Sequence, residues 1–164
     1  RMKRAIRTGL LMTIASLTAV TACGGESKIQ IGGFMMLSVD VTEYVTEGTS
    51  NFVGSWNGCS GIGGYNDFGS GMDVSIRDAD GKIIGTTSTR NFSTSDLSSD
   101  DEDLKSAAVS TQENSELACG VLYGPISVPK SEFYEVEIGS RGTLTYSYEE
   151  LVAAKFWTFS TLGQ

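Results

Sequence analysis

Short runs in which hydrophobic and polar residues alternate cover much of the chain after residue 27. The first run spans Lys28 to Val41, and its polar residues Gln30, Ser38 and Asp40 take the parity opposite to the hydrophobic ones. Because successive side chains of a strand point to opposite faces, this run predicts a strand with one buried face. The glycine pair Gly32-Gly33 predicts a bend within it. The hydrophobic set is Ile29, Ile31, Met35, Leu37, Val39 and Val41.

A second alternating run predicts a β-hairpin. Met72, Val74 and Ile76 alternate with polar residues, and residues 82–89 form a second run of the same kind. Between them stands Asp78-Ala79-Asp80-Gly81, which is typical of a tight turn. Aspartate side chains bond to nearby backbone amides and glycine accepts a positive φ, so this segment is expected to reverse the chain.

The rest of the pattern predicts an all-β domain with one short helix. Further strands are expected at 51–55, 119–128, 134–138, 144–146 and 156–162. Ser147 followed three residues later by Glu150 is a capping-box pattern, which predicts a helix near 147–155. Seven or eight short strands favour an antiparallel β-sandwich. Residues 28–164 are long enough to form one domain with its own core.

Residues 90–118 show no such alternation. This stretch is rich in serine and acidic residues, with Asp100-Asp101-Glu102-Asp103 near its centre. Because it offers little apolar surface to bury, it is interpreted as a mobile, solvated loop inserted into the domain. The alternative is a short helix over residues 101–109, with Ser98 or Ser99 as its N-cap.

The first 22 residues have the layout of an export signal. Four basic residues precede an uncharged, mostly apolar run from Gly9 to Val20, which is too short for a permanent membrane span. Val20-Thr21-Ala22-Cys23 resembles the lipobox of bacterial lipoproteins, which implies cleavage before Cys23 and acylation of its thiol. Residues 23–27 would then be a short tether. The alternative is ordinary cleavage, which would leave Cys23 a free thiol.

The two other cysteines form an even pair once Cys23 is acylated. An exported chain rarely leaves a thiol unpaired, so a disulfide between Cys59 and Cys119 is expected. It would close a loop of about sixty residues, which the chain-entropy model values at roughly 4 kcal/mol. The alternative is two buried free thiols, which suits an oxidising compartment poorly.

The composition of the chain excludes several kinds of partner and of catalytic mechanism. The net charge is −8, and loss of the four basic residues of the signal makes it about −12, which argues against nucleic acid as a partner. The chain has no histidine, which removes Ser-His-Asp and Cys-His catalysis but not carboxylate chemistry. Asp78 and Asp80 lack the further oxygen ligands of a calcium loop. No metal or cofactor site is expected.

Several motifs in order resemble a family of small exported proteins and lipoproteins of actinobacteria. They are Cys59-Ser60-Gly61-Ile62-Gly63-Gly64-Tyr65-Asn66-Asp67, Asp78-Ala79-Asp80-Gly81-Lys82, a second cysteine at 119, and Phe133-Tyr134-Glu135-Val136-Glu137-Ile138 with Arg141-Gly142. The resemblance covers most of residues 29–162. It implies an envelope location, the cysteine pair and a β fold, and it assigns no activity. The hairpin and the later strand are also similar to prealbumin-like sandwiches, with an immunoglobulin-like arrangement ranked just behind.

Three residues are candidates for a ligand surface. Tyr65, Asp67 and Arg141 all fall in predicted turns, and tyrosine and arginine often anchor interfaces. The leading hypothesis is a non-enzymatic binding module, held by the lipid on Cys23 at the extracytoplasmic face of the cell membrane, that binds an envelope protein or a cell-wall component. The alternatives are a glycan hydrolase using two carboxylates, drawn from Asp67, Asp73 and the glutamates, or a structural spacer lipoprotein.

Overall fold

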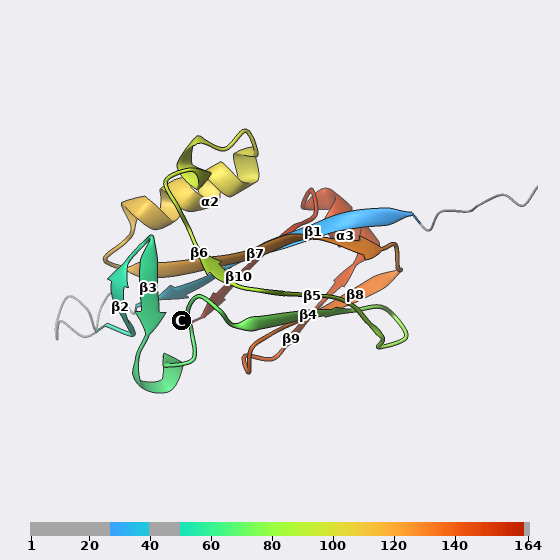
Figure 1. Cartoon of the computed structure of the whole chain (residues 1–164), viewed down its shortest axis with the longest axis horizontal. Coiled ribbons are helices and arrows are strands. Elements are labelled where there is room, and N and C mark those ends of the chain that lie inside the picture. The colour runs from blue at the N-terminus through green and yellow to red at the C-terminus, as the bar shows by residue number, and fades with distance from the viewer. Residues whose placement is uncertain (1–26, 40–49, 163–164) are drawn as a thin grey trace, which may run out of the picture.

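The computed structural model describes residues 27–39 and 50–162, and its described part is mostly β (Figure 1). The predicted signal peptide and Cys23 lie outside the described residues, as does Val41 at the end of the first predicted strand. The strands are β1 (Lys28–Ser38), β2 (Phe52–Ser55), β3 (Gly58–Gly61), β4 (Asp73–Arg77), β5 (Ile83–Ser88), β6 (Arg90–Asn91), β7 (Ala118–Pro129), β8 (Phe133–Ile138), β9 (Thr143–Ser147) and β10 (Trp157–Leu162). The α-helices are α2 (Glu102–Glu113) and α3 (Tyr148–Ala153), and the 3₁₀ turns are η1 (Gly63–Tyr65) and η2 (Asp96–Ser98).

These strands form two four-stranded sheets and one two-stranded ribbon. One sheet has the order β10-β1-β7-β6, the other has the order β5-β4-β8-β9, and β2 pairs with β3. Every pair is antiparallel except β1 with β10, which is parallel. The expectation of a fully antiparallel fold is therefore wrong for this pair. The alternation of side chains along a strand shows which face is buried but not the direction of its neighbour, so the pattern could not indicate this pairing.

The predicted hairpin is confirmed as β4 and β5. One oxygen of Asp78, Oδ1, accepts from the backbone N–H groups of Asp80 (3.0 Å) and Lys82 (2.9 Å). Gly81 takes a φ of 75°, which a residue with a Cβ rarely adopts. Turn chemistry that could be identified in the sequence thus fixes the chain reversal.

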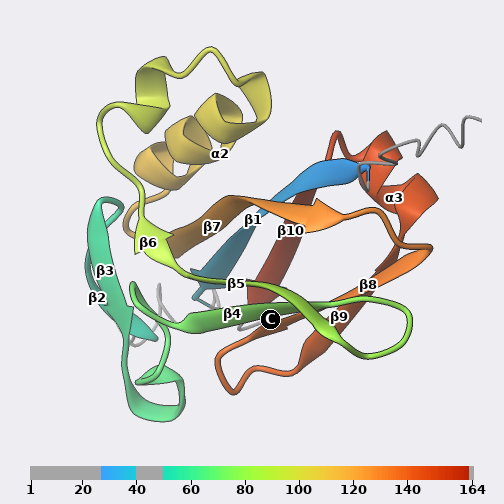
Figure 2. The same ribbon diagram turned by 45° about the vertical axis from the view of Figure 1, so that its right-hand side comes forward.

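The two four-stranded sheets lie in separate layers and share one hydrophobic core (Figure 2). The alternation predicted in β4 and β8 is confirmed, because their inward side chains are all buried. These side chains are Val74, Ile76, Tyr134, Val136 and Ile138, and they meet Ile31, Leu37 and Val121 of the other sheet. The strand β1 departs from the expected single buried face. Phe34, on its second face, packs in another cluster with Phe92, Ala108 and Leu122.

A disulfide joins the β2–β3 ribbon to the first sheet. Cys59 in β3 and Cys119 in β7 are bonded, with their Cα atoms 5.8 Å apart, and both residues are buried. The predicted pairing is confirmed. It ties together positions sixty residues apart, on either side of the segment that contains α2.

Residues 90–118 are not a loop without secondary structure, so that interpretation is wrong, and the alternative of a helix that starts near residue 101 is confirmed, although the helix is longer than expected. They contain β6, η2 and the twelve-residue helix α2, which packs on the outer face of the β10-β1-β7-β6 sheet (Figure 1). The N-cap is Asp101, whose Oδ1 accepts from the amides of Asp103 and Leu104 at 3.1 Å, and neither predicted serine takes this position. Ala108 and Thr111 are fully buried. Burial of this small-residue face stabilises a helix whose other sides are polar.

The shorter helix α3 is confirmed where the capping box predicts it. Ser147 Oγ accepts from the amide of Glu150 (3.2 Å), and the Glu150 carboxylate accepts from the amide of Ser147 (2.7 Å). The bonds that the Glu150 carboxylate accepts from the amide and the hydroxyl of Ser147 lower the pKa of Glu150. In the described part of the chain, neither helix has the length and apolar character that a membrane crossing requires.

Candidate functional site

The structure brings the three predicted surface residues together. Arg141 lies in the turn between β8 and β9, and Tyr65 and Asp67 lie in and just after η1. The Arg141 guanidinium forms an ion pair with Asp67 and donates to the carbonyl of Gly64 (3.2 Å). Its Cζ atom lies 5.0 Å from the centroid of the Tyr65 ring, within cation–π range. Residues 74 positions apart thus form one group.

The polar atoms of this group are mostly directed at one another. Ser140 Oγ donates to the second oxygen of Asp67 at 2.6 Å, so both carboxylate oxygens are occupied. The Arg141 side chain is only 16% exposed. These contacts fasten the η1 turn to the β8–β9 turn. The open surface with the strongest binding character lies elsewhere.

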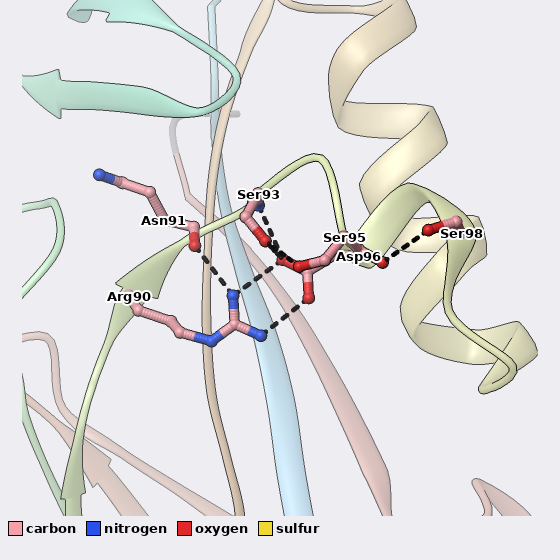
Figure 3. Close-up of polar contacts among 6 residues, drawn as sticks. All are labelled: Arg90, Asn91, Ser93, Ser95, Asp96 and Ser98. Carbon is pink, nitrogen blue, oxygen red and sulfur yellow. Dashed lines mark hydrogen bonds and ion pairs between the residues drawn. The ribbon is translucent and has the colours of Figure 1, made fainter.

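A second polar group forms where the chain leaves β6. Arg90 donates to both oxygens of Asp96 at 2.8 and 2.9 Å, and the amide and hydroxyl of Ser93 donate to the same carboxylate at 2.7 and 2.9 Å (Figure 3). Asp96 is 5% exposed, and hydrogen bonds from Arg90 lower its pKa despite burial. The bond to Asp96 raises the pKa of Arg90 in turn. Sequence reasoning missed this pair, although Ser93 followed three residues later by an acid is a capping signal.

A hollow with an apolar lining lies between α2 and β10. It is a groove of about 460 Å³, and three aromatic residues of β1 and β10 lie along it. Its lining residues are Phe34, Met36, Asp103, Ser106, Ala107, Ser110, Ala154, Trp157, Thr158 and Phe159. Phe159 is 57% exposed, so a large aromatic ring of this lining is open to solvent. We call this feature the α2–β10 groove.

The floor of the α2–β10 groove is fixed by packing and by the backbone. The rings of Phe34 and Trp157 stack with centroids 4.8 Å apart. Gly32 pairs with Trp157 in the parallel register, and a Cβ there would collide with the indole ring. Lys155 and Phe156 have positive φ values of 49° and 64°, which turn the chain sharply from α3 into β10. Two such non-glycine residues in a row are costly, and they persist because the surrounding structure holds them.

The wall of the groove is tied to its floor by polar contacts. Trp157 Nε1 donates to Asp101 Oδ2 at 3.1 Å, while the other oxygen of Asp101 caps α2. Lys155 Nζ lies 3.4 Å from Asp103 Oδ2. Both contacts link the first turn of α2 to the segment that begins β10. Sequence reasoning expected a strand at 156–162 but did not single out its residues.

The carboxylates considered for hydrolysis are placed differently. Asp73 and Glu137 line a hollow of about 360 Å³ on the outer face of the β5-β4-β8-β9 sheet. Glu137 lies 3.7 Å from Arg77 and accepts from Ser75 at 3.4 Å. Asp67 is bound in the Arg141 group and does not share this hollow. Among residues 27–39 and 50–162, no three His, Cys, Asp or Glu side chains gather in an arrangement that could hold a metal ion.

Comparisons of the chain with protein-family models, with curated proteins and with solved structures found no significant match. The function is therefore argued from the described fold, the α2–β10 groove and the N-terminal sequence.

Proposed function

We propose that this chain is a lipid-anchored protein of the extracytoplasmic face of a cell membrane, and that its β domain is a non-enzymatic binding module for an envelope protein or cell-wall partner. The observation that carries the proposal is the α2–β10 groove. It combines exposed aromatic surface with a floor and a wall that are fixed by Phe34, Trp157 and Asp101. A preformed concave surface with aromatic anchors is the usual design of a recognition site.

The proposed location rests on the N-terminal sequence and on the disulfide. A basic start, an apolar run and Val20-Thr21-Ala22-Cys23 support acylation at Cys23. The buried bond between Cys59 and Cys119 suits an oxidising compartment outside the cytoplasm. Two acyl chains would give stable attachment. Only five positions separate Cys23 from the first residue of β1, so the tether would reach at most about 17 Å.

We further propose that the two layers form a prealbumin-like β-sandwich. In immunoglobulin domains the disulfide joins the two sheets, and a buried tryptophan packs against it. In this chain the bond joins β7 to the β2–β3 ribbon, and Trp157 stacks on Phe34 beneath the α2–β10 groove. These differences favour the prealbumin-like arrangement over the immunoglobulin-like one.

The binding role is preferred over hydrolysis because of where the carboxylates lie. Glycosidases hold two carboxyl groups about 5–10 Å apart across a cleft that surrounds the sugar. Asp73 and Glu137 lie on the outer face of a sheet, in a hollow that is smaller and more polar than the α2–β10 groove. Glu137 is also engaged by Arg77 and Ser75, which hold it in the sheet surface.

The anchor is tested by metabolic labelling with an alkyne analogue of palmitate, followed by fractionation of the cells. The wild-type chain should carry the label and sediment with membranes. Cys23→Ala should lose both properties, whereas Cys59→Ala with Cys119→Ala should keep the label. Release of the wild-type chain into the medium without label would refute the anchor.

The binding role is tested by photo-crosslinking in living cells. A photoreactive phenylalanine analogue replaces Phe159 in one strain and Val53 of β2 in another, since both side chains are 57% exposed. Position 159 should yield one discrete adduct, whose partner also co-purifies with the wild-type chain and is lost from Phe159→Asp. The matched position 53 should not yield it. Identical adduct patterns from the two positions would contradict the proposal.

A further inference from the structure

We infer that the α2–β10 groove takes an extended peptide with basic side chains, which pairs with the outer edge of β10 and so adds a fifth strand to the β10-β1-β7-β6 sheet. This inference rests on the proposed binding function and names the chemical class of its partner. It is carried by three features of the described residues: the backbone of β10, the aromatic floor of the groove, and the charge of the wall.

The backbone of β10 offers one edge for pairing. Gly32 N donates to the carbonyl of Phe156 (3.1 Å), and the parallel register continues from Gly32 opposite Trp157 to Leu37 opposite Leu162. In a parallel ladder this pattern turns the even-numbered backbone groups of β10 toward β1. The N–H and C=O groups of Phe159 and Thr161 therefore face outward. No strand among the described residues pairs with that edge.

An outward row of backbone donors and acceptors is a template for another strand. Proteins usually cover or charge such an edge, and those that leave it open often use it to bind extended peptides. β10 carries no charged residue between Trp157 and Leu162, so it has none of the charges that commonly block edge pairing. An added strand would lie about 4.8 Å from β10.

The aromatic floor would receive every second side chain of that strand. Phe159 is 57% exposed and lies beside the outward backbone groups, and Trp157 is held flat by its stack on Phe34. Alternate side chains of the added strand would project onto this surface. The floor thus selects apolar residues among the side chains on this face of the peptide.

The wall rises from the same face of the sheet as the floor, so it selects the charge of other side chains on that face of the peptide. The N-terminal end of α2 carries Asp100, Asp101, Glu102 and Asp103. Lys155 lies 3.4 Å from Asp103 and Lys105 lies 4.0 Å from Glu102, so the acidic side chains outnumber their cationic partners. A neighbouring hollow on α2 holds Glu113 together with Glu102 and Lys105. The whole chain carries a net charge of −8. A second copy of this chain would bring the same acidic turn, so charge complementarity favours a basic peptide as the occupant.

The probe is a fluorescein-labelled peptide of about eight residues, close to the length of a strand. Every second residue, which faces the groove, is valine and lysine in turn, and threonine stands at the positions between them. Its binding to the full chain is followed by fluorescence anisotropy. Methylation of alternate backbone amides should weaken binding about tenfold or more, because it removes the pairing donors. Replacement of every lysine by glutamate should weaken it at least as much. Raising the salt concentration from about 0.05 to about 0.5 M should weaken it severalfold.

Variants of the chain locate the binding surface. Phe159→Ala should weaken binding of the lysine–valine peptide about fivefold, and the matched control Val53→Ala should leave it unchanged. If Phe159→Ala fails to fold, the three peptides compared on the wild-type chain still decide the matter. Equal affinity for the basic, acidic and methylated peptides would overturn the inference.

The other occupants are distinguished by the adduct at position 159. A photo-crosslink between two copies of this chain, with a dimer in light scattering, would overturn the basic-peptide assignment but leave a binding surface at the groove. A crosslink from position 159 to another segment of the same chain would overturn both this inference and the proposed function. A discrete crosslinked partner at position 159, together with equal affinity of the chain for the basic, acidic and methylated peptides, would overturn only this inference.

Discussion

The disulfide allows a quantitative test of how this fold is stabilised. We compare the full chain carrying Cys23→Ala with the same chain carrying Cys59→Ala and Cys119→Ala as well, so that no third thiol can exchange with the pair. The bond spans sixty residues. The loop-entropy relation gives a loss of about 4 kcal/mol in the free energy of unfolding when it is removed. That is a large share of the 5–15 kcal/mol typical of a domain.

The assay is urea denaturation followed by the fluorescence of the two tryptophans, Trp56 and Trp157. The midpoint should fall, and the dependence of the free energy on urea should steepen because the uncrosslinked unfolded chain exposes more surface. Reduction of the reference chain removes the bond but keeps both sulfurs, so it separates loop entropy from packing at the buried cysteines. A loss below about 1 kcal/mol in both comparisons would refute the loop-entropy reasoning.

Substitutions at three further positions test other parts of the fold by the same denaturation assay. Asp96→Asn should cost about 2 kcal/mol at neutral pH, because it breaks the charged hydrogen bonds from Arg90. Since the folded pKa of Asp96 is lowered, this difference should vanish as the pH falls below the ordinary carboxyl range and through that pKa; a pH-independent difference would contradict the assignment. Gly120→Ala should cost about 1–3 kcal/mol, because its Cβ would lie 2.9 Å from Thr111 of α2; an unchanged midpoint would mean that α2 shifts freely. Ser147→Ala should cost about 1 kcal/mol through loss of the α3 cap, and Ser147→Asp should restore most of it.

The elements that sequence reasoning found are those specified by local chemistry. The hairpin follows from the alternation around Val74 and Ile76 and from the side chain of Asp78, which bonds to amides two and four residues later. The helix α3 follows from a capping box that spans only Ser147 to Glu150. In each case the residues that decide the structure are neighbours in the chain, so the pattern is complete within a short window.

The helix α2 was misjudged because its stabilising contacts are distant and small. Its acidic first turn suggested a solvated loop, although aspartate and glutamate at a helix N-terminus are favourable. Its buried face consists of Ala108 and Thr111, which carry little hydrophobicity to signal a core position. That face packs closely because Gly120 of β7 has no side chain. A glycine in one strand and an alanine in a helix give no sequence signal that they will meet.

The group formed by Arg141, Asp67 and Tyr65 was predictable in part. The turn positions of Tyr65, Asp67 and Arg141 were predictable, and their choice as surface candidates identified residues that do come together. That these side chains contact one another could not be predicted, because their contacts depend on how the two sheets place two turns that are distant in the sequence. Residue type alone indicates that a side chain can bind something, and the fold decides whether that partner lies within the chain.

The α2–β10 groove depends on a strand pairing that local pattern could not give. β10 lies parallel to β1, and this placement brings Trp157 onto Phe34 and over Gly32. The helix α2 is held at the side of the groove by Asp101, which caps the helix and accepts from Trp157 with the same carboxylate. Because one carboxylate does both, the acidic turn and the aromatic floor keep a fixed spacing. The position of the charge and the shape of the groove are therefore set by the same contact, which is the arrangement that selective recognition of a charged, extended partner requires.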